Sequence, residues 1–341
     1  MKAVFIRAHG ELDAVEFGDM PEPMAGPGEV VVDVRAAALN HLDIWVRKGG
    51  RVALPVPHIL GSDCAGVVAE VGPGVAGMDV GDAVVVSPGL PCGECEFCRR
   101  GEQSECLDFG IIGLSRSGVF AERAAVPAAN VHAKPAELSF EEAASLGIAY
   151  LTAWRMLFSR AKVRPGETVL IHGIGGGVAL AALQFATRAG ARVLVTSSSD
   201  AKLARAREMG AASGINYRGA DVAEAVRELT AGRGVDVAFN TVGAAAWPID
   251  FAAVRRGGRI VLCGVTTGAE APTNLQALYW NQLTVVGSTM GSDDDFRLML
   301  ATVAAGGMKP VIDSAVPLAE ARAAMGRMEA GEQFGKVLLT P

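Results

Sequence analysis

The sequence has no long uncharged hydrophobic run, no excess of positive charge and no low-complexity linker. Nowhere do eighteen uncharged apolar residues follow one another, and charges are scattered through residues 1–17, so we expect neither a membrane span nor an export signal. The net charge is −6 and basic residues form no stripe, which argues against nucleic acid and membrane surfaces as partners. We therefore predict a cytoplasmic protein.

Cysteine is scarce outside one short segment. The two isolated cysteines, Cys64 and Cys263, lie in apolar runs that resemble strands, where cysteine usually serves as a small hydrophobic residue, and we assign neither a redox role. The other four fall within fifteen residues: Cys92, Cys95, Cys98 and Cys106. In a long chain without an export signal, such clustering indicates a metal site more than disulfides.

These four cysteines have two, two and seven residues between them, a spacing that lets one irregular segment wrap a tetrahedral ion. Zn²⁺ binds thiolates at about 2.3 Å, and four thiolates close its coordination shell. A closed shell leaves no position for water or substrate, so the predicted zinc is structural. An unmetallated loop and a disulfide pair remain the alternatives.

The length of 341 residues predicts two domains, and the texture of the sequence changes near residue 140. Up to about residue 135, short β-like runs are cut by Gly and Pro. A helix then begins after Ser139, with Glu142 in the capping-box position. Beyond it, β-rich runs alternate with amphipathic helices, which predicts a parallel, doubly wound α/β sheet.

A glycine loop follows the first strand of this second part, in the stretch VLIHGIGGGVALAALQ. A buried strand, a glycine loop and a helix start are the setting in which backbone N–H groups hold a pyrophosphate. The match to G-x-G-x-x-G is imperfect, and an ordinary strand-to-helix turn is the alternative. We predict dinucleotide contacts from Gly175, Gly176, Gly177 and Val178.

The second strand of this part ends at Ser197, where NAD-binding folds usually place an acidic residue on the ribose hydroxyls. A carboxylate there would repel a 2′-phosphate. Its absence, together with Ser198, Ser199 and Lys202 nearby, favours NADP(H) over NAD(H). The alternative is a solvated turn with an incidental lysine.

The order of these parts resembles the medium-chain dehydrogenase/reductase superfamily over the whole chain. The resemblance rests on the cysteine segment and on PGEVVVDVRAAALNHLD, HILGSDCAGVVAEVGPGV, GDAVVV, LTAW, GARVLVTSSSDAKLARAREMGA and FGKVLL. It implies a GroES-like β-rich catalytic domain over residues 1–140 and 284–341, with a structural zinc lobe at about 90–108. It also implies a Rossmann dinucleotide-binding domain over residues 141–283.

Zinc alcohol dehydrogenases of this superfamily hold a second, catalytic zinc, and its ligand positions differ here. Asn40, Ser62 and Ile148 stand where the three ligands would be, and Asp63 stands where glutamate follows the histidine. Amide, hydroxyl and alkane groups do not replace thiolate or imidazole on Zn²⁺, so we predict that the catalytic zinc is absent. A displaced metal site built from His41, Asp43 and Asp63 remains an alternative.

The residues that remain resemble the zinc-free, quinone-oxidoreductase-like branch, whose Asn-x-x-Asp-x-x-x-Arg-x-Gly run begins at Asn40. We take Asn40, Asp43, Ser62 and Asp63 as candidate catalytic residues, with the Asn40 amide donating to a developing oxyanion. An ion pair between Asp43 and Arg47 that fixes the loop is the structural alternative. The resemblance also places Thr152, Val242, Cys263, Gly264, Val265 and Ser288 at the cofactor.

Without a Lewis acid, reduction of an activated alkene or a quinone is easier than oxidation of a simple alcohol. We therefore expect an NADPH-dependent reductase of α,β-unsaturated carbonyls, enoyl thioesters or quinones, with a small-molecule substrate and one structural zinc per subunit. An alcohol or aldehyde dehydrogenase and a non-catalytic cofactor-binding protein are the alternatives. The run QLTVVGSTMG predicts the last strand of the cofactor sheet, and the resemblance implies that this edge pairs across a two-fold axis, so we expect a homodimer or homotetramer.

Overall fold

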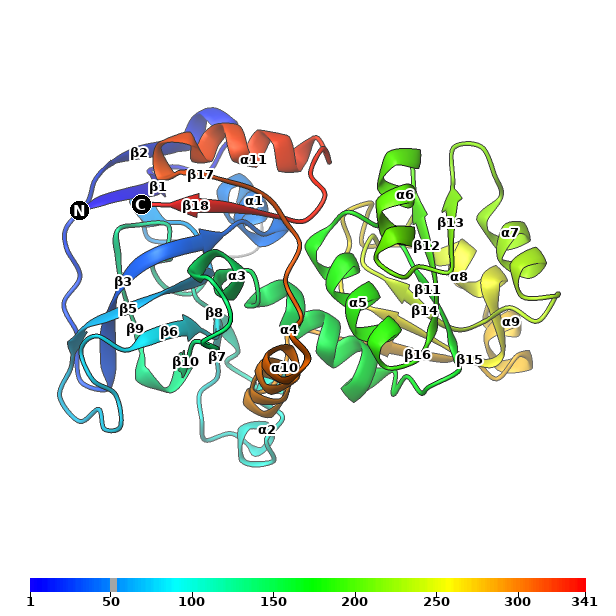
Figure 1. Ribbon diagram of the computed structural model, residues 1–341, viewed down its shortest axis with the longest axis horizontal. Coiled ribbons are helices and arrows are strands. Elements are labelled where there is room, and N and C mark those ends of the chain that lie inside the picture. The colour runs from blue at the N-terminus through cyan, green and yellow to red at the C-terminus, as the bar shows by residue number, and fades with distance from the viewer. Residues whose placement is uncertain (50–53) are drawn as a thin grey trace. The chain divides into compact units, whose positions relative to one another are not determined.

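The structure, a computed structural model, describes residues 1–49 and 54–341 (Figure 1). It divides into two compact units. The first contains Met1–Ala149 and Ser292–Pro341, and the second contains Tyr150–Gly291. Among the described residues, no helix is long and apolar enough to cross a membrane.

A seven-stranded sheet forms the centre of the first unit, in the order β10-β6-β5-β3-β18-β17, with β9 also paired to β3. All neighbours are antiparallel except β17 and β18. The strands are β3 (Glu29–Ala38), β5 (Asp63–Val71), β6 (Ala83–Val86), β9 (Arg123–Pro127), β10 (Val131–Ala133), β17 (Ile312–Pro317) and β18 (Lys336–Thr340). The last two strands come from the C-terminal segment, which therefore completes the sheet.

Two smaller sheets and several short helices complete this unit. The sheets contain β1 (Lys2–Ile6), β2 (Val15–Asp19) and β4 (His58–Ile59), and separately β7 (Gly89–Leu90) and β8 (Gly110–Ile111). The α-helices are α1 (His41–Lys48), α2 (Glu96–Arg99), α3 (Phe140–Ala144), α10 (Asp293–Gly306) and α11 (Ala321–Glu329). The 3₁₀-helices are η1 (Leu12–Ala14), η2 (Gln103–Glu105), η3 (Ala128–Asn130) and η5 (Leu318–Glu320).

The core of the first unit explains why β3 is almost continuously apolar. Its Val30, Val32 and Val34 side chains belong to one buried cluster that also takes Phe120 and residues of α11. A strand covered on both faces needs no polar alternation. The capping box predicted at Ser139 is confirmed, because its hydroxyl accepts the Glu142 N–H while Glu142 accepts the Ser139 N–H.

The second unit is built on a six-stranded sheet whose neighbouring strands are all parallel, in the order β13-β12-β11-β14-β15-β16. This order is that of a doubly wound dinucleotide-binding sheet, so the predicted α/β class is confirmed. The strands are β11 (Thr168–Ile171), β12 (Arg192–Ser197), β13 (Ser213–Asn216), β14 (Val235–Asn240), β15 (Val254–Leu262) and β16 (Thr284–Gly287).

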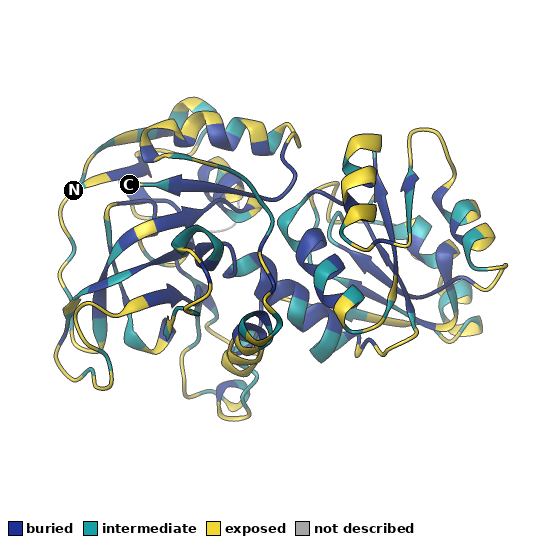
Figure 2. Ribbon diagram, in the orientation of Figure 1, coloured by how far each residue is buried: buried dark blue, intermediate teal, exposed yellow. Residues whose placement is uncertain are grey.

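Helices connect these strands, and burial follows the layers (Figure 2). They are α4 (Ile148–Trp154), which begins in the first unit, the π-helix η4 (Arg155–Arg160), α5 (Gly177–Arg188), α6 (Asp200–Glu208), α7 (Val222–Leu229), α8 (Trp247–Ala253) and α9 (Leu275–Trp280). Central β14 is buried at every residue, whereas edge strand β16 is exposed or half-buried throughout. The sheet therefore has one open, partly apolar edge.

Candidate functional site

The four clustered cysteines lie on the segment between β7 and β8, together with the short helices α2 and η2. Their sulfur atoms all lie within 4.8 Å of one another, with Cys92 to Cys98 at 3.9 Å and Cys95 to Cys98 at 3.5 Å. Sulfurs placed tetrahedrally around zinc at 2.3 Å would be about 3.8 Å apart. The donor set therefore fits a four-thiolate zinc site.

Backbone N–H groups around this cluster favour thiolates. The Cys92 N–H donates to Cys106 Sγ at 3.2 Å, and the Cys95 N–H donates to Cys92 Sγ at 3.4 Å. N–H groups of Cys98 and Leu107 lower the pKa of the Cys95 thiol to about 6, whereas burial raises that of the Cys98 thiol to about 12. A closed shell of four sulfurs leaves no place for a substrate.

A second polar cluster forms at the end of β3, where the sheet register gathers residues that are far apart in sequence. Ala38, the last residue of β3, pairs with Asp63 of β5 on one side and with Leu338 of β18 on the other. Two residues later, Asn40 precedes α1, and its N–H donates to Asp43 Oδ2 at 2.7 Å. The Asn40 side chain itself contacts residues at the starts of β5 and β18.

The Asn40 side-chain amide bridges a carboxylate and an ammonium. Its Nδ2 donates to Asp63 Oδ2 at 2.9 Å and to the Ala38 carbonyl at 3.2 Å. Its Oδ1 accepts from Lys336 Nζ at 2.6 Å, and Lys336 also donates to the Leu39 carbonyl at 2.7 Å. Lys336 Nζ lies 3.5 Å from Asp63 Oδ2, which closes a triangle of side chains.

Asp63 also reaches the start of α4, because its Oδ1 accepts the Ile148 N–H at 2.9 Å. The three positions that would carry catalytic zinc ligands thus all lie next to Asp63. Asn40 and the Ile148 N–H donate to its carboxylate, and Ser62 precedes it in the chain. Ser62 is fully buried, and its hydroxyl has no hydrogen-bond partner in the described structure. Asn40 keeps 7% of its surface exposed, which makes it the most accessible of the four candidate catalytic residues.

Burial governs the charges in this cluster. It raises the pKa of Asp63, against the opposing effects of Lys336 and Asn40, and it lowers the pKa of Lys336, against the opposing charges of Asp63 and Asp43. It also raises the pKa of Asp43 to about 7, with the Asp63 charge adding to the effect. Burial thus disfavours every charge in this cluster, and the mutual contacts of Asp63, Lys336 and Asn40 offset part of that cost.

The expected ion pair between Asp43 and Arg47 is replaced by other partners. Fully buried Arg47 donates to Glu329 of α11 at 2.6 Å and to the Gly10 carbonyl at 3.1 Å, while Asp43 accepts from the Asn40 backbone. Arg47 thus ties α1 to α11. Within residues 1–49 and 54–341, the four cysteines are the only group of three or more His, Cys, Asp or Glu placed to hold a metal, so His41, Asp43 and Asp63 do not form one.

In the second unit, the glycine loop leads from β11 into the start of α5. Gly175 has a φ of 119°, a region that favours glycine, and Gly176 precedes the twelve-residue helix α5, which begins at Gly177 and continues with Val178. The free N–H groups and dipole at this helix start favour an anion. The Ser288 hydroxyl after β16 is a buried polar atom without a partner among the described residues, as expected where a bound molecule completes the contacts.

A buried network holds the loops that follow β11 and β14. His172 Nε2 lies 2.8 Å from Asp250 Oδ1, and Asn240 Nδ2 donates to Asp250 Oδ2 at 2.7 Å. Asn240 Oδ1 accepts the N–H groups of Val242 and Gly243 at 2.9 and 2.8 Å. The network thus fixes the loop at Val242, one of the positions predicted to touch the cofactor.

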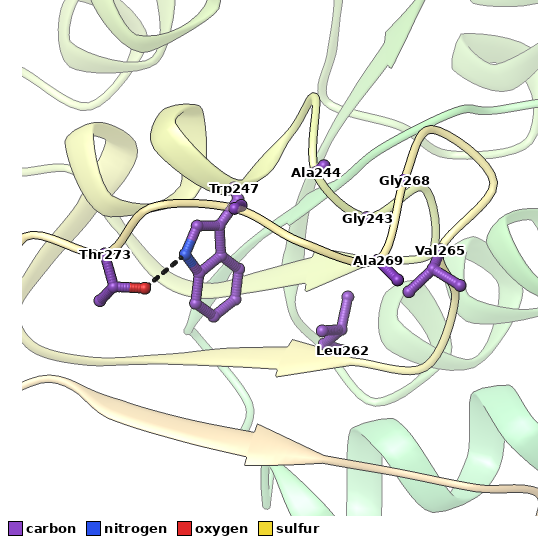
Figure 3. Close-up of a pocket in the computed structure, with 9 residues that line it drawn as sticks. Gly243, Ala244, Trp247, Leu262, Val265, Gly268, Ala269 and Thr273 are labelled. Carbon is purple, nitrogen blue, oxygen red and sulfur yellow. Dashed lines mark hydrogen bonds between the residues drawn. The ribbon is translucent and has the colours of Figure 1, made fainter.

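The loops after β14 and β15 come close through glycines. A Cβ on Gly243 would lie 2.7 Å from Val265 Cα, and one on Gly264 would lie 2.3 Å from the Thr241 carbonyl. Beside them is a cavity of about 140 Å³ lined by Gly243, Val265 and Trp247, whose indole N–H donates to Thr273 at 3.0 Å (Figure 3). The loop that contains Val242 therefore lies against the loop that contains Cys263, Gly264 and Val265.

The remaining cofactor positions lie on other elements of the second unit. Ser197 ends β12 and is buried, and its hydroxyl accepts the Ser199 N–H at 3.2 Å across half-buried Ser198. Ser199 caps α6 by accepting the Lys202 N–H at 3.4 Å. Thr152 lies buried in α4.

Four residues of the Asn40 cluster and of the buried network in the second unit were not predicted from the sequence: Lys336, His172, Asn240 and Asp250. A signal existed for Lys336, which interrupts the apolar run FGKVLL at the first residue of a buried strand. His172 offered a similar signal, since it follows the buried strand β11 and precedes the glycine loop.

Two family profiles match the chain. The profile for the alcohol dehydrogenase GroES-like domain covers residues 26–136, and the profile for zinc-binding dehydrogenases covers residues 177–305. A zinc-type alcohol dehydrogenase-like protein of Schizosaccharomyces pombe is 35% identical over 333 residues, 94% of this chain and 93% of that protein.

Solved structures agree over the whole chain. The crystal structure of an NAD-dependent alcohol dehydrogenase matches with a TM-score of 0.96 and 44% identity, covering all of both chains. A crotonyl-CoA carboxylase/reductase in complex with NADP matches with a TM-score of 0.93 and 26% identity, covering 100% of this chain and 94% of that one. Both kinds of chemistry, on alcohols and on enoyl thioesters, are thus found on this fold.

The cysteine site gives a direct metal test. Cys106→Ser is expected to lower bound zinc from one per chain to near zero and the melting temperature by roughly 5 °C, because the shell loses a thiolate. Metal analysis by mass spectrometry and thermal unfolding measure both. Cys263→Ser, outside the cluster, is the matched control and should keep its zinc. Wild-type zinc content in the Cys106→Ser protein would contradict the assignment.

Proposed function

Because the chain belongs to the zinc-type alcohol dehydrogenase-like group of the medium-chain dehydrogenase/reductase superfamily, we propose that it is an NADPH-dependent reductase of activated C=C bonds or quinones. Its substrates are α,β-unsaturated carbonyls, enoyl thioesters or quinones. Each subunit carries one structural zinc, held by the four cysteines. No catalytic zinc takes part.

One observation supports this proposal most strongly: the residues at the catalytic zinc position offer no zinc ligands, and two of them, Asn40 and Ile148, donate to Asp63. The Asn40 amide lies between Asp63 and Lys336, and Ile148 contributes only its backbone N–H to Asp63. None of Asn40, Ser62 and Ile148 offers the sulfur, imidazole or carboxylate ligand that Zn²⁺ takes. A carbonyl oxygen at this place would meet hydrogen-bond donors and not a Lewis acid.

Hydrogen-bond donors are sufficient for this chemistry. When bound, the reduced nicotinamide supplies the hydride, which adds to the electrophilic β-carbon of the substrate. The electron pair of the C=C bond then moves toward the carbonyl, where negative charge develops on oxygen. The Asn40 amide donates to that oxygen, and the resulting enolate takes a proton from water. The alkoxide of a simple alcohol has no conjugated system over which its charge can spread, so hydrogen-bond donors alone stabilise it less well.

The neighbours support both this reading and one competitor. The likeness to a crotonyl-CoA carboxylase/reductase shows that enoyl thioester chemistry occurs on the same fold. The 44% identity with an NAD-dependent alcohol dehydrogenase favours an alcohol or aldehyde dehydrogenase as the second candidate. That candidate requires a metal ligand set that the described residues near Asn40 do not provide.

Metal content and substrate range together test the proposal. Protein purified without added metal is expected to hold one zinc per chain and to oxidise NADPH with enals or quinones. Aldehydes and simple alcohols, assayed in parallel, should give little or no turnover. Metal analysis is paired with absorbance at 340 nm across the panel.

Two results would overturn it. Two zincs per chain with chelator-sensitive aldehyde reduction would establish the alcohol dehydrogenase. Cofactor binding without turnover of any compound in the panel would indicate a protein that binds the cofactor and has lost catalysis.

We also propose that NADP(H) is preferred over NAD(H). Ser197 ends β12 at the position where an acidic residue would bind the ribose hydroxyls of NAD. Helix α6 begins just after it, with Ser199 as its N-cap and the Lys202 N–H in its first turn. A neutral hydroxyl at this point leaves room for a 2′-phosphate without charge repulsion. The preference differs from that named for the NAD-dependent neighbour.

Ser197→Asp tests this preference. The new carboxylate should repel the 2′-phosphate and shift the ratio of kcat/KM for NADPH over NADH by tenfold or more toward NADH, about 1.4 kcal/mol. Ser197→Asn has a similar size without the charge and should keep the wild-type preference. A wild-type enzyme that already prefers NADH would refute the assignment.

The open edge of the second unit supports a homodimer or a dimer of dimers. Edge strand β16 exposes Val285, and nearby α9 exposes Leu275, Tyr279 and Trp280. Unpaired strand edges with apolar side chains favour pairing with another chain. A second copy of this chain, joined edge to edge about a two-fold axis, would satisfy both features.

Val285→Asp is expected to reduce the assembly to monomers, because it places a charge on the pairing edge. Sedimentation measures the mass of the wild type and the variant. Val80→Asp, which changes another exposed valine, in the first unit, should keep the wild-type mass. A wild-type protein that sediments as a monomer would disprove the proposal.

A further inference from the structure

We propose that Lys336 and Asp63 act as a pair of positioning residues that orient the Asn40 amide, so that one Nδ2 hydrogen is available to the substrate oxygen. The inference rests on the proposed function, since it concerns how the same site handles the developing oxyanion. Lys336 and Asp63 do not touch the substrate. They determine which end of the amide faces which neighbour.

The orientation of an asparagine amide depends on its partners, because its oxygen and nitrogen ends have the same shape. At Asn40 the hydrogen-bond partners allow only one orientation of the amide. An ammonium has only donors, so the end 2.6 Å from Lys336 Nζ must be the oxygen. A carboxylate paired with that ammonium accepts, so the end 2.9 Å from Asp63 Oδ2 must be the nitrogen. Reversal would place two donors together and two acceptors together.

The two Nδ2 hydrogens are not held equally. One goes to the charged Asp63 at 2.9 Å, and the other goes to the neutral Ala38 carbonyl at 3.2 Å. Bonds to charged acceptors are stronger, so an incoming oxyanion displaces the Ala38 carbonyl before it displaces Asp63. The Lys336 ammonium that donates to Oδ1 draws electron density from the amide and makes the released N–H a better donor.

Accessibility agrees with this division. Asn40 is 7% exposed, whereas the side chains of Asp63 and Lys336 are 0% and 4% exposed. Asn40 is therefore the least buried member of the cluster. The other two are the first residues of β5 and β18.

Gly147 shows how tightly Asp63 is placed. A Cβ built on Gly147 would lie 2.2 Å from Asp63 Oδ1, so any other residue there displaces the carboxylate. The space left by this glycine lets Asp63 accept the Ile148 N–H while its other oxygen holds Asn40. Gly147→Ala therefore perturbs Asp63 without changing the charge of any residue.

The charged groups that face Lys336 are Asp63, Asp43 and, at the start of α1, His41. Desolvation and the Lys336 charge lower the pKa of His41, and burial raises that of Asp43 to about 7, so both titrate near or below neutral pH. Burial lowers the pKa of Lys336 from its usual value, so this lysine loses its proton at a lower pH than an exposed lysine does. Arginine in the same place would stay charged over the whole range.

The experiment compares the wild type with Lys336→Arg and Lys336→Met, measuring kcat and KM for NADPH-linked enal reduction between pH 6 and 10. Wild-type kcat is expected to fall with rising pH as Lys336 loses its proton. Lys336→Arg should remain active without that fall. Lys336→Met should lose about tenfold or more in kcat at pH 7 with the NADPH dissociation constant unchanged. Lys2→Met, which removes an exposed lysine of the same unit, is the control.

A fall in kcat with rising pH that is identical in the wild type and Lys336→Arg, or wild-type kcat in Lys336→Met, would overturn the inference. If Lys336→Met does not fold, the arginine profile decides alone. Gly147→Ala should lower kcat with little change in the NADPH dissociation constant, and unchanged kcat there would also count against the inference. Failure of the proposed function looks different, because the wild type would then reduce no enal or quinone at any pH.

Discussion

The first unit depends on one buried carboxylate. Asp63 has no exposed surface, and its two oxygens accept hydrogen bonds from Asn40 and from the Ile148 backbone, with Lys336 as the neighbouring cation. A buried charge without partners is strongly destabilising, so these contacts are conditions for folding as well as parts of a site. The register of β3 with β5 and β18 is what brings the partners together.

The carboxylate also explains why the two ends of the sequence must meet. Asn40 and Lys336 are 296 residues apart, and β18 adds the last strand of the chain beside β3. Arg47 and Glu329 repeat the pattern between α1 and α11. Both contacts join an early segment to the C-terminal one, so the site is complete only after the whole chain has folded.

Local signals were sufficient for much of the architecture. The spacing of the four cysteines, the Ser139 capping box and the β/α alternation each depend on residues close in sequence, and the structure bears out the capping box and the alternation. The cysteine sulfurs also come together within 4.8 Å. Such features are readable because the chain itself fixes the distances between their parts.

Long-range polar pairs could not be predicted in the same way. Arg47 was expected to pair with Asp43, four residues away on the same helix, but its partner is Glu329 on α11. The choice depends on which helix packs against α1, and no spacing in the sequence states this. The role of Lys336 could not be predicted for the same reason, since a single lysine in a hydrophobic strand does not indicate which carboxylate will be its partner. His172 and Asp250, 78 residues apart, are a third case.

The separation between the sulfur cluster and the Asn40 cluster has a physiological consequence. In the proposed function zinc only holds a segment in shape, while the chemistry relies on a cation that the chain makes for itself. Scarcity of the metal in the cell would then act on the yield of folded protein. It would leave the turnover of each molecule that had already folded unchanged, so supply of the ion would control abundance and not rate.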